Sequence, residues 1–115
     1  MKHIVEQTWI TGTSQQIDFY ELLRLSRQYV KRGSKIFIGT DSFISKQKVW
    51  FASAVCLHGG LDNGRYFFYK ENLSKHKFVQ LVSRITEETK RSVEIASLFM
   101  NEYNINPNNI ELHLD

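Results

Sequence analysis

The chain has 115 residues, which predicts a single domain, residues 1–115, large enough to bury a core. Fifteen basic and twelve acidic side chains give a net charge of +3, which is compatible with a nucleic-acid partner without requiring one. A single cysteine, Cys56, excludes an internal disulfide and a multi-cysteine zinc site. The longest mostly apolar run, 49–57, is too short to span a bilayer. We therefore expect a cytoplasmic protein without a membrane partner.

The first predicted element is a helix over residues 14–32. Apolar residues recur at helical spacing in this segment, with Phe19 and Leu22 among them. Thr13, followed three residues later by Gln16, resembles a capping box, and Gly33 suits the position just past the helix end.

Three strands should follow as an antiparallel meander, over 35–43, 49–57 and 65–70. Apolar residues occupy both sides of the pleat at 36–38, so the first of these strands should be central and covered on both faces. A turn at 45–48 and a glycine-rich loop at 58–64 should connect the strands.

A long helix is predicted over 74–103, with Ser74 as its N-cap, and a last strand over 110–115. The helix should bury one apolar stripe, made of Phe78, Leu81, Val82, Ile85, Thr89, Val93, Ala96, Phe99 and Tyr103. A strand-helix-strand crossover favours a last strand parallel to the first. The predicted fold class is therefore α/β with a mixed sheet and an N-terminal helix.

Asp41 ends the buried central strand within Gly39-Thr40-Asp41-Ser42. A carboxylate in that position is costly unless it is paired, hydrogen-bonded or bound to a metal. The alternative interpretation is that Asp41 only caps the turn that follows.

Glu88 lies in the long helix beside the predicted apolar stripe, whereas Glu87 falls on the opposite side and should be solvated. Glu88 could therefore reach the sheet. Alternatively, Glu88 simply pairs with Arg84 or Arg91 at helical spacing.

His113 and Asp115 alternate with Leu112 and Leu114 on the last strand, and Asp115 could sit near Asp41. The alternative is a frayed terminus, because Asp115 is the final residue. Three acids on a central strand, its covering helix and a neighbouring strand would suit Mg²⁺ or Mn²⁺, which prefer carboxylate oxygens. Two such ions can promote hydrolysis of a phosphodiester.

These motifs resemble the YkuK-type family of ribonuclease H-like proteins over residues 35–115, most specifically in Gly39-Thr40-Asp41-Ser42, with Glu88-Thr89 and His113-Leu114-Asp115 in support. The resemblance implies a ribonuclease H-like fold and a nuclease site in which Asp41, Glu88 and Asp115 match the first three acidic positions. On this hypothesis Asp41 bridges the metals, Glu88 and Asp115 each hold one side, and His113 orients groups or carries a proton.

Nucleic acid is the expected partner, with Ser42, Lys75, Lys77 and Arg84 as predicted contacts, although Lys75 and Lys77 would also suit a solvated helix end. Cys56, Trp9, Trp50 and Phe51 are expected in the core.

Family members continue past the His-x-Asp strand with another strand and helix, whereas this sequence stops at Asp115. The last strand should then have an unpaired outer edge. Either the sequence is truncated or a partner chain, such as a second copy, covers that edge. The alternative to a nuclease is accordingly a catalytically inactive binding or oligomerisation module with the same fold.

Overall fold

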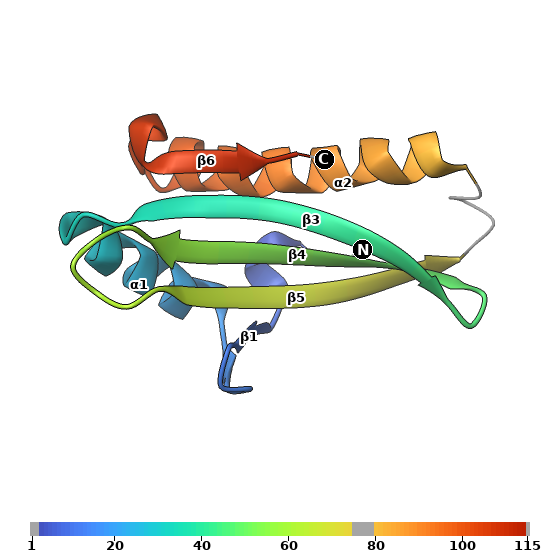
Figure 1. Ribbon diagram of the computed structural model, residues 1–115, viewed down its shortest axis with the longest axis horizontal. Coiled ribbons are helices and arrows are strands. Elements are labelled where there is room, and N and C mark those ends of the chain that lie inside the picture. The colour runs from blue at the N-terminus through green and yellow to red at the C-terminus, as the bar shows by residue number, and fades with distance from the viewer. Residues whose placement is uncertain (1–2, 75–79, 115) are drawn as a thin grey trace.

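A computed structural model describes residues 3–74 and 80–114 and shows one mixed sheet with two long helices (Figure 1). The sheet has six strands in the order β2-β1-β5-β4-β3-β6. The strands are β1 Trp9–Thr11, β2 Gln16–Ile17, β3 Lys35–Ser45, β4 Lys48–His58, β5 Arg65–Ser74 and β6 Ile110–His113. The helices are α1 Phe19–Lys31 and α2 Leu81–Ser97, and short helical turns occur at Ile4–Glu6, Leu98–Glu102 and Pro107–Asn109.

The predicted meander and crossover are confirmed. β3, β4 and β5 pair antiparallel in chain order, and β6 pairs parallel to β3. β3 and β4 are longer than expected because a two-residue hairpin turn joins them. Lys46 and Gln47 both adopt positive φ, as the tightest hairpins require, although neither is a typical turn residue.

The N-terminal helix starts later than predicted. Residues 16–17 form β2, which pairs with β1, and the helix begins at Phe19. Its N-cap is Asp18, whose Oδ1 accepts a hydrogen bond from the Glu21 backbone N–H at 2.8 Å. The proposed capping box at Thr13 is therefore wrong, because a small hairpin occupies that segment.

The second long helix begins later than predicted, and its first part exposes apolar side chains that were expected to be buried. It begins at Leu81, and Ser74, the expected N-cap, belongs to β5. Residues 75–79, which include the predicted contacts Lys75 and Lys77, lie outside the described residues. Leu81 and Val82 of the predicted stripe are 62% and 72% exposed, whereas Arg91 and Ser92 are buried. The stripe prediction is confirmed for Ala96 and Phe99, which are buried, and wrong for Leu81 and Val82, because polar side chains occupy part of the buried face of this helix.

Both helices pack on one face of the sheet, which we call the inner face. Apolar side chains of α1, α2 and the sheet meet there, among them Phe19, Leu22, Ile36, Ile38, Val55, Leu57, Phe67, Ile95 and Phe99. Among the described residues, no helix covers the opposite, open face of β3, β4 and β5 (Figure 1). The sequence predicted that β3 is central and covered on both faces. Within the described residues, β3 is instead covered on one face only and lies next to the edge strand β6.

Arg91 holds α2 to the inner face through a buried ionic cluster. Its guanidinium group, with 3% of the side chain exposed, contacts Glu71 of β5 at 2.6 Å and Glu87 at 2.7 Å. It also lies 4.7 Å from the ring centre of Phe51. Burial alone would lower the pKa of Arg91, but hydrogen bonds to the two carboxylates raise it overall. Glu87 was predicted to be solvated, and this prediction is wrong, because Glu87 is one of the partners of this buried cation.

Replacing Asp18 tests the assignment of the helix start. We expect Asp18→Ala to lower the free energy of unfolding by about 1 kcal/mol, the usual cost of losing an N-cap. Thr13→Ala is the matched control and should change it by less than about 0.5 kcal/mol. Urea denaturation of both variants measures the difference, and a larger loss for Thr13→Ala would contradict the assignment.

Replacing Arg91 tests the ionic cluster. Arg91→Met keeps most of the side-chain volume but leaves Glu71 and Glu87 without their cation, so we expect a loss of about 3–5 kcal/mol of stability. The neighbouring exposed residue provides the control, Lys90→Met, which should stay within about 0.5 kcal/mol of the wild type. Similar urea midpoints for both variants would show that the cluster does not hold the helix in place.

Candidate functional site

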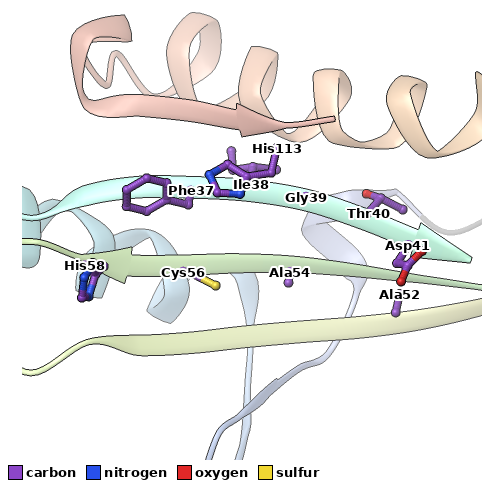
Figure 2. A pocket seen from close by; sticks show the side chains of 10 residues that line it. All are labelled: Phe37, Ile38, Gly39, Thr40, Asp41, Ala52, Ala54, Cys56, His58 and His113. Carbon is purple, nitrogen blue, oxygen red and sulfur yellow. The ribbon is translucent and has the colours of Figure 1, made fainter. Parts of the chain in front are cut away.

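Asp41 lies on the open face of the sheet, within the interior strand β3 (Figure 2). It is paired with Ala52 of β4, and its side chain is exposed. The Oδ1 atom of Asp41 accepts a hydrogen bond from the Ser42 backbone N–H at 3.0 Å. The strand continues to Ser45, so Asp41 does not cap a turn immediately after it.

A hollow of about 640 Å³ extends from Asp41 along the open face. Small side chains create it, because Ala52, Ala54 and Gly39 fill little of the surface between their neighbours (Figure 2). A Cβ atom at Gly39 would make ordinary van der Waals contact with β6, 3.5 Å from the Cβ of His113, so the glycine is not required for the pairing of β3 with β6. The hollow is mainly apolar, with Asp41 near one end.

Two histidines, His113 and His58, also line this hollow. His113 of β6 pairs in register with Gly39 and meets the ring of Phe37 edge-on, with centres 5.3 Å apart. His58 lies on the other side of Phe37, at 6.4 Å. Cys56 also lines the hollow, but burial raises the pKa of its thiol, so it is not an activated nucleophile. Asp41 and His113 thus share one face.

Glu88 lies on the inner face instead. Its carboxylate accepts a short hydrogen bond from the hydroxyl group of Ser42. Arg84 completes this contact by donating to the hydroxyl and carbonyl oxygens of Ser42, both at 3.2 Å. Glu88 therefore reaches the sheet, as expected from the helical wheel, and it meets Arg84 at Ser42. Ser42 and Arg84, both predicted to contact nucleic acid, are hydrogen-bonded to each other.

Asp41 and Glu88 are consequently not brought together. Successive residues of a strand point to opposite faces, so Ser42 faces α2 and Asp41 faces away from it. Over residues 3–74 and 80–114, no group of three His, Cys, Asp or Glu side chains is placed to hold a metal ion. Asp115, the third predicted ligand, lies outside the described residues.

Sequence reasoning missed the aromatic side chains of the open face. Trp9 and Phe51 are buried as predicted, but Trp50 is only partly buried and stacks on Phe43, with ring centres 6.3 Å apart and planes at 8°. The alternation in β4 could have predicted this. Its buried apolar residues Val49, Phe51, Val55 and Leu57 all lie at odd positions, whereas Trp50 lies at an even position and so points to the other face.

A family model described as ribonuclease H-like matches residues 19–115. No curated protein and no solved structure matches the chain significantly. Within the described residues, no helix is long and apolar enough to cross a membrane. The matched region covers both long helices and the strands β3 to β6, and the chain belongs to the ribonuclease H-like family.

Proposed function

We propose that the chain is a nuclease that hydrolyses phosphodiester bonds of nucleic acid on the open face of its sheet, at Asp41. The observation that carries this proposal is the placement of an exposed carboxylate on β3, an interior strand of a ribonuclease H-like sheet, beside a hollow that His113 also lines. The motif Gly39-Thr40-Asp41-Ser42 further supports a finer placement in the YkuK-type family. A cytoplasmic location stays a prediction.

The metal site expected from the sequence does not fit the described geometry. Asp41 and Glu88 lie on opposite faces of β3, and the carboxylate of Glu88 already accepts a hydrogen bond from the hydroxyl group of Ser42. These two carboxylates therefore cannot share one ion in this arrangement, and we derive no step through a metal. The requirement for Mg²⁺ or Mn²⁺ stays a prediction that the activity assay below addresses.

The open-face residues suggest how the reaction would be assisted. Asp41 would orient a water molecule and accept its proton as the water oxygen attacks phosphorus. The bond from phosphorus to the leaving oxygen breaks, and His113 would supply the proton that this oxygen takes up. Glu88 would act as a positioning residue, because its hydrogen bond fixes Ser42, the neighbour of Asp41 in the strand.

A second candidate function is assembly without catalysis, and the edge strand favours it. Among the described residues, β6 is an edge strand of the sheet, and Leu112 and Leu114 are exposed on or next to it. An exposed edge with apolar side chains is a template for strand addition.

A second copy of this chain is the occupant that the edge fits. In an antiparallel pair centred on Leu112, Glu111 would face His113 of the other copy, and Ile110 would face Leu114. Centring the pair on Glu111 or on His113 would instead place two identical polar or charged side chains opposite each other, which is less favourable. The edge is therefore self-complementary in one register.

The nuclease proposal predicts a strong dependence on Asp41. We expect the wild type to cleave RNA, DNA or hybrid substrates, and assays with Mg²⁺, with Mn²⁺ and with a chelator test the predicted metal requirement separately. Asp41→Asn should reduce the rate by about 100-fold or more, as expected for a positioned acid-base group. Equal rates for the wild type and Asp41→Asn would overturn the proposal.

The positioning role of Glu88 is tested in the same assay. Glu88→Gln and Ser42→Ala disrupt the same contact, so each should lower kcat about tenfold with little change in KM, and the double variant should be no worse than either. Additive losses would mean that Glu88 acts independently of Ser42.

The assembly proposal predicts a dimer that depends on charge pairing at β6. Glu111→Lys should weaken dimerisation about tenfold or more in sedimentation velocity, whereas the exposed Glu102→Lys should not. The exchange Glu111→His with His113→Glu should restore the dimer, although it also removes the 3.3 Å contact between Lys35 and Glu111. A monomer at high concentration, or no rescue by the exchange, would overturn this proposal.

A further inference from the structure

We propose that the open face is a binding platform for single-stranded nucleic acid, with a base-stacking and phosphate-binding hollow next to Asp41. This inference names the form of the substrate for the function proposed above. It rests on that function for the reaction at Asp41, whereas binding can be measured without it.

Two stacked aromatic pairs stand on the open face. Phe43 and Trp50 lie parallel across β3 and β4, and Tyr66 and Phe68 lie on β5 with ring centres 6.4 Å apart and planes at 22°. Phe43 is 43% and Tyr66 is 51% exposed. Large aromatic side chains grouped on an uncovered sheet face indicate a binding surface rather than a core.

Lysines are placed among these rings. The Nζ atom of Lys70 lies 5.9 Å from the ring centre of Phe43 and 5.8 Å from that of Phe68. A hollow of about 500 Å³ is lined by Phe43, Ser45, Lys46, Lys48, Trp50 and Lys70. Within the part of the chain that the structure describes, none of these three lysines forms an ion pair. Their charges are therefore available to an anionic ligand.

Aromatic rings and unpaired lysines together specify the ligand class. Single-stranded nucleic acid is held by bases that stack on aromatic rings and by cations that follow its phosphates. A duplex keeps its bases stacked inside and offers the rings no face. A second copy of this chain would bring its own three lysines against these three, and this repulsion disfavours self-association through the platform.

The register of the strands connects this hollow to Asp41. Asp41 precedes Phe43 by two residues on the same face, and Ala52 lies between Asp41 and Lys70 on neighbouring strands. The small side chain of Ala52 leaves the space between the acid and the lysine open. A nucleic-acid strand whose bases stack on Phe43 and Trp50 would therefore pass Asp41 and continue into the larger hollow near His113.

Fluorescence anisotropy of the Asp41→Asn variant, in the presence of a chelator, tests binding apart from hydrolysis. The probes are labelled 12-nucleotide oligodeoxythymidylate and oligouridylate, with a hairpin duplex of similar length for comparison. We expect the single strands to bind at least tenfold more tightly than the duplex. Equal affinity for single strands and duplex would overturn the inference.

Charge and stacking variants locate the surface. Lys48→Gln with Lys70→Gln should reduce the salt dependence of binding by about 1.4 in log–log slope, the effect of two lost phosphate contacts. The control pair Lys31→Gln with Lys90→Gln removes two exposed lysines elsewhere and should leave the slope unchanged. A similar change in both pairs would place the ligand elsewhere.

Trp50 provides a direct optical readout. Stacking of a base should quench its fluorescence, and the quenching should disappear in Trp50→Phe, which keeps a stacking ring and leaves the buried Trp9 as background. Trp50→Leu should weaken binding about tenfold. Quenching that persists in Trp50→Phe would overturn the platform. A wild-type dimer that dissociates in Phe43→Lys would also overturn it, because the open face would then bind a second copy of the chain.

The outcomes separate this inference from the nuclease proposal. Platform-dependent binding without any hydrolysis would leave the platform standing and overturn the nuclease. Hydrolysis that depends on Asp41 but is unaffected by the lysine and Trp50 variants would overturn the platform alone.

Discussion

The pleat of β3 is the constraint on which the other features of this protein depend. Neighbouring residues of the strand serve two different surfaces, so that Ser42 faces α2 and Asp41 faces the open side. A shift of one residue in the pairing of this strand would exchange the two surfaces and expose the core positions Ile36 and Ile38. The burial of those apolar side chains therefore determines where the carboxylate of Asp41 is presented.

The same constraint explains which parts of the site could be predicted from the sequence. The position of Asp41 on a partly buried interior strand follows from local hydrophobicity, and the direction of Glu88 follows from helical geometry. Whether the two side chains meet depends on which face of the sheet the helix covers, and that is a tertiary property. Spacing along the chain holds no information about it, because a helix over either face has the same sequence separation from the strand.

Local patterns failed elsewhere for identifiable physical reasons. An apolar stripe predicts the buried face of a helix only where apolar contacts hold that helix. Ile95 and Ala96 hold the end of α2 in this way, whereas Arg91 contacts Glu71 and Glu87 one turn earlier. The N-terminal hairpin was missed because its strands are only two and three residues long and give no periodic signal. The start of α1 was displaced for the same reason, although its true cap, Asp18, is itself a favoured capping residue.

An uncovered sheet face needs a physical reason for its composition. Aromatic side chains such as Phe43 and Tyr66 lose hydrophobic stabilisation while they remain exposed, since burying one is worth roughly 1.5–3 kcal/mol. Lysine stems recover part of that loss by covering the rings, as Lys70 does between Phe43 and Phe68. A polyanion with flat bases would satisfy both the rings and the ammonium groups, whereas an apolar partner would have to desolvate the lysines. The mixture of rings and charges on this face therefore favours a nucleic-acid strand over a protein surface.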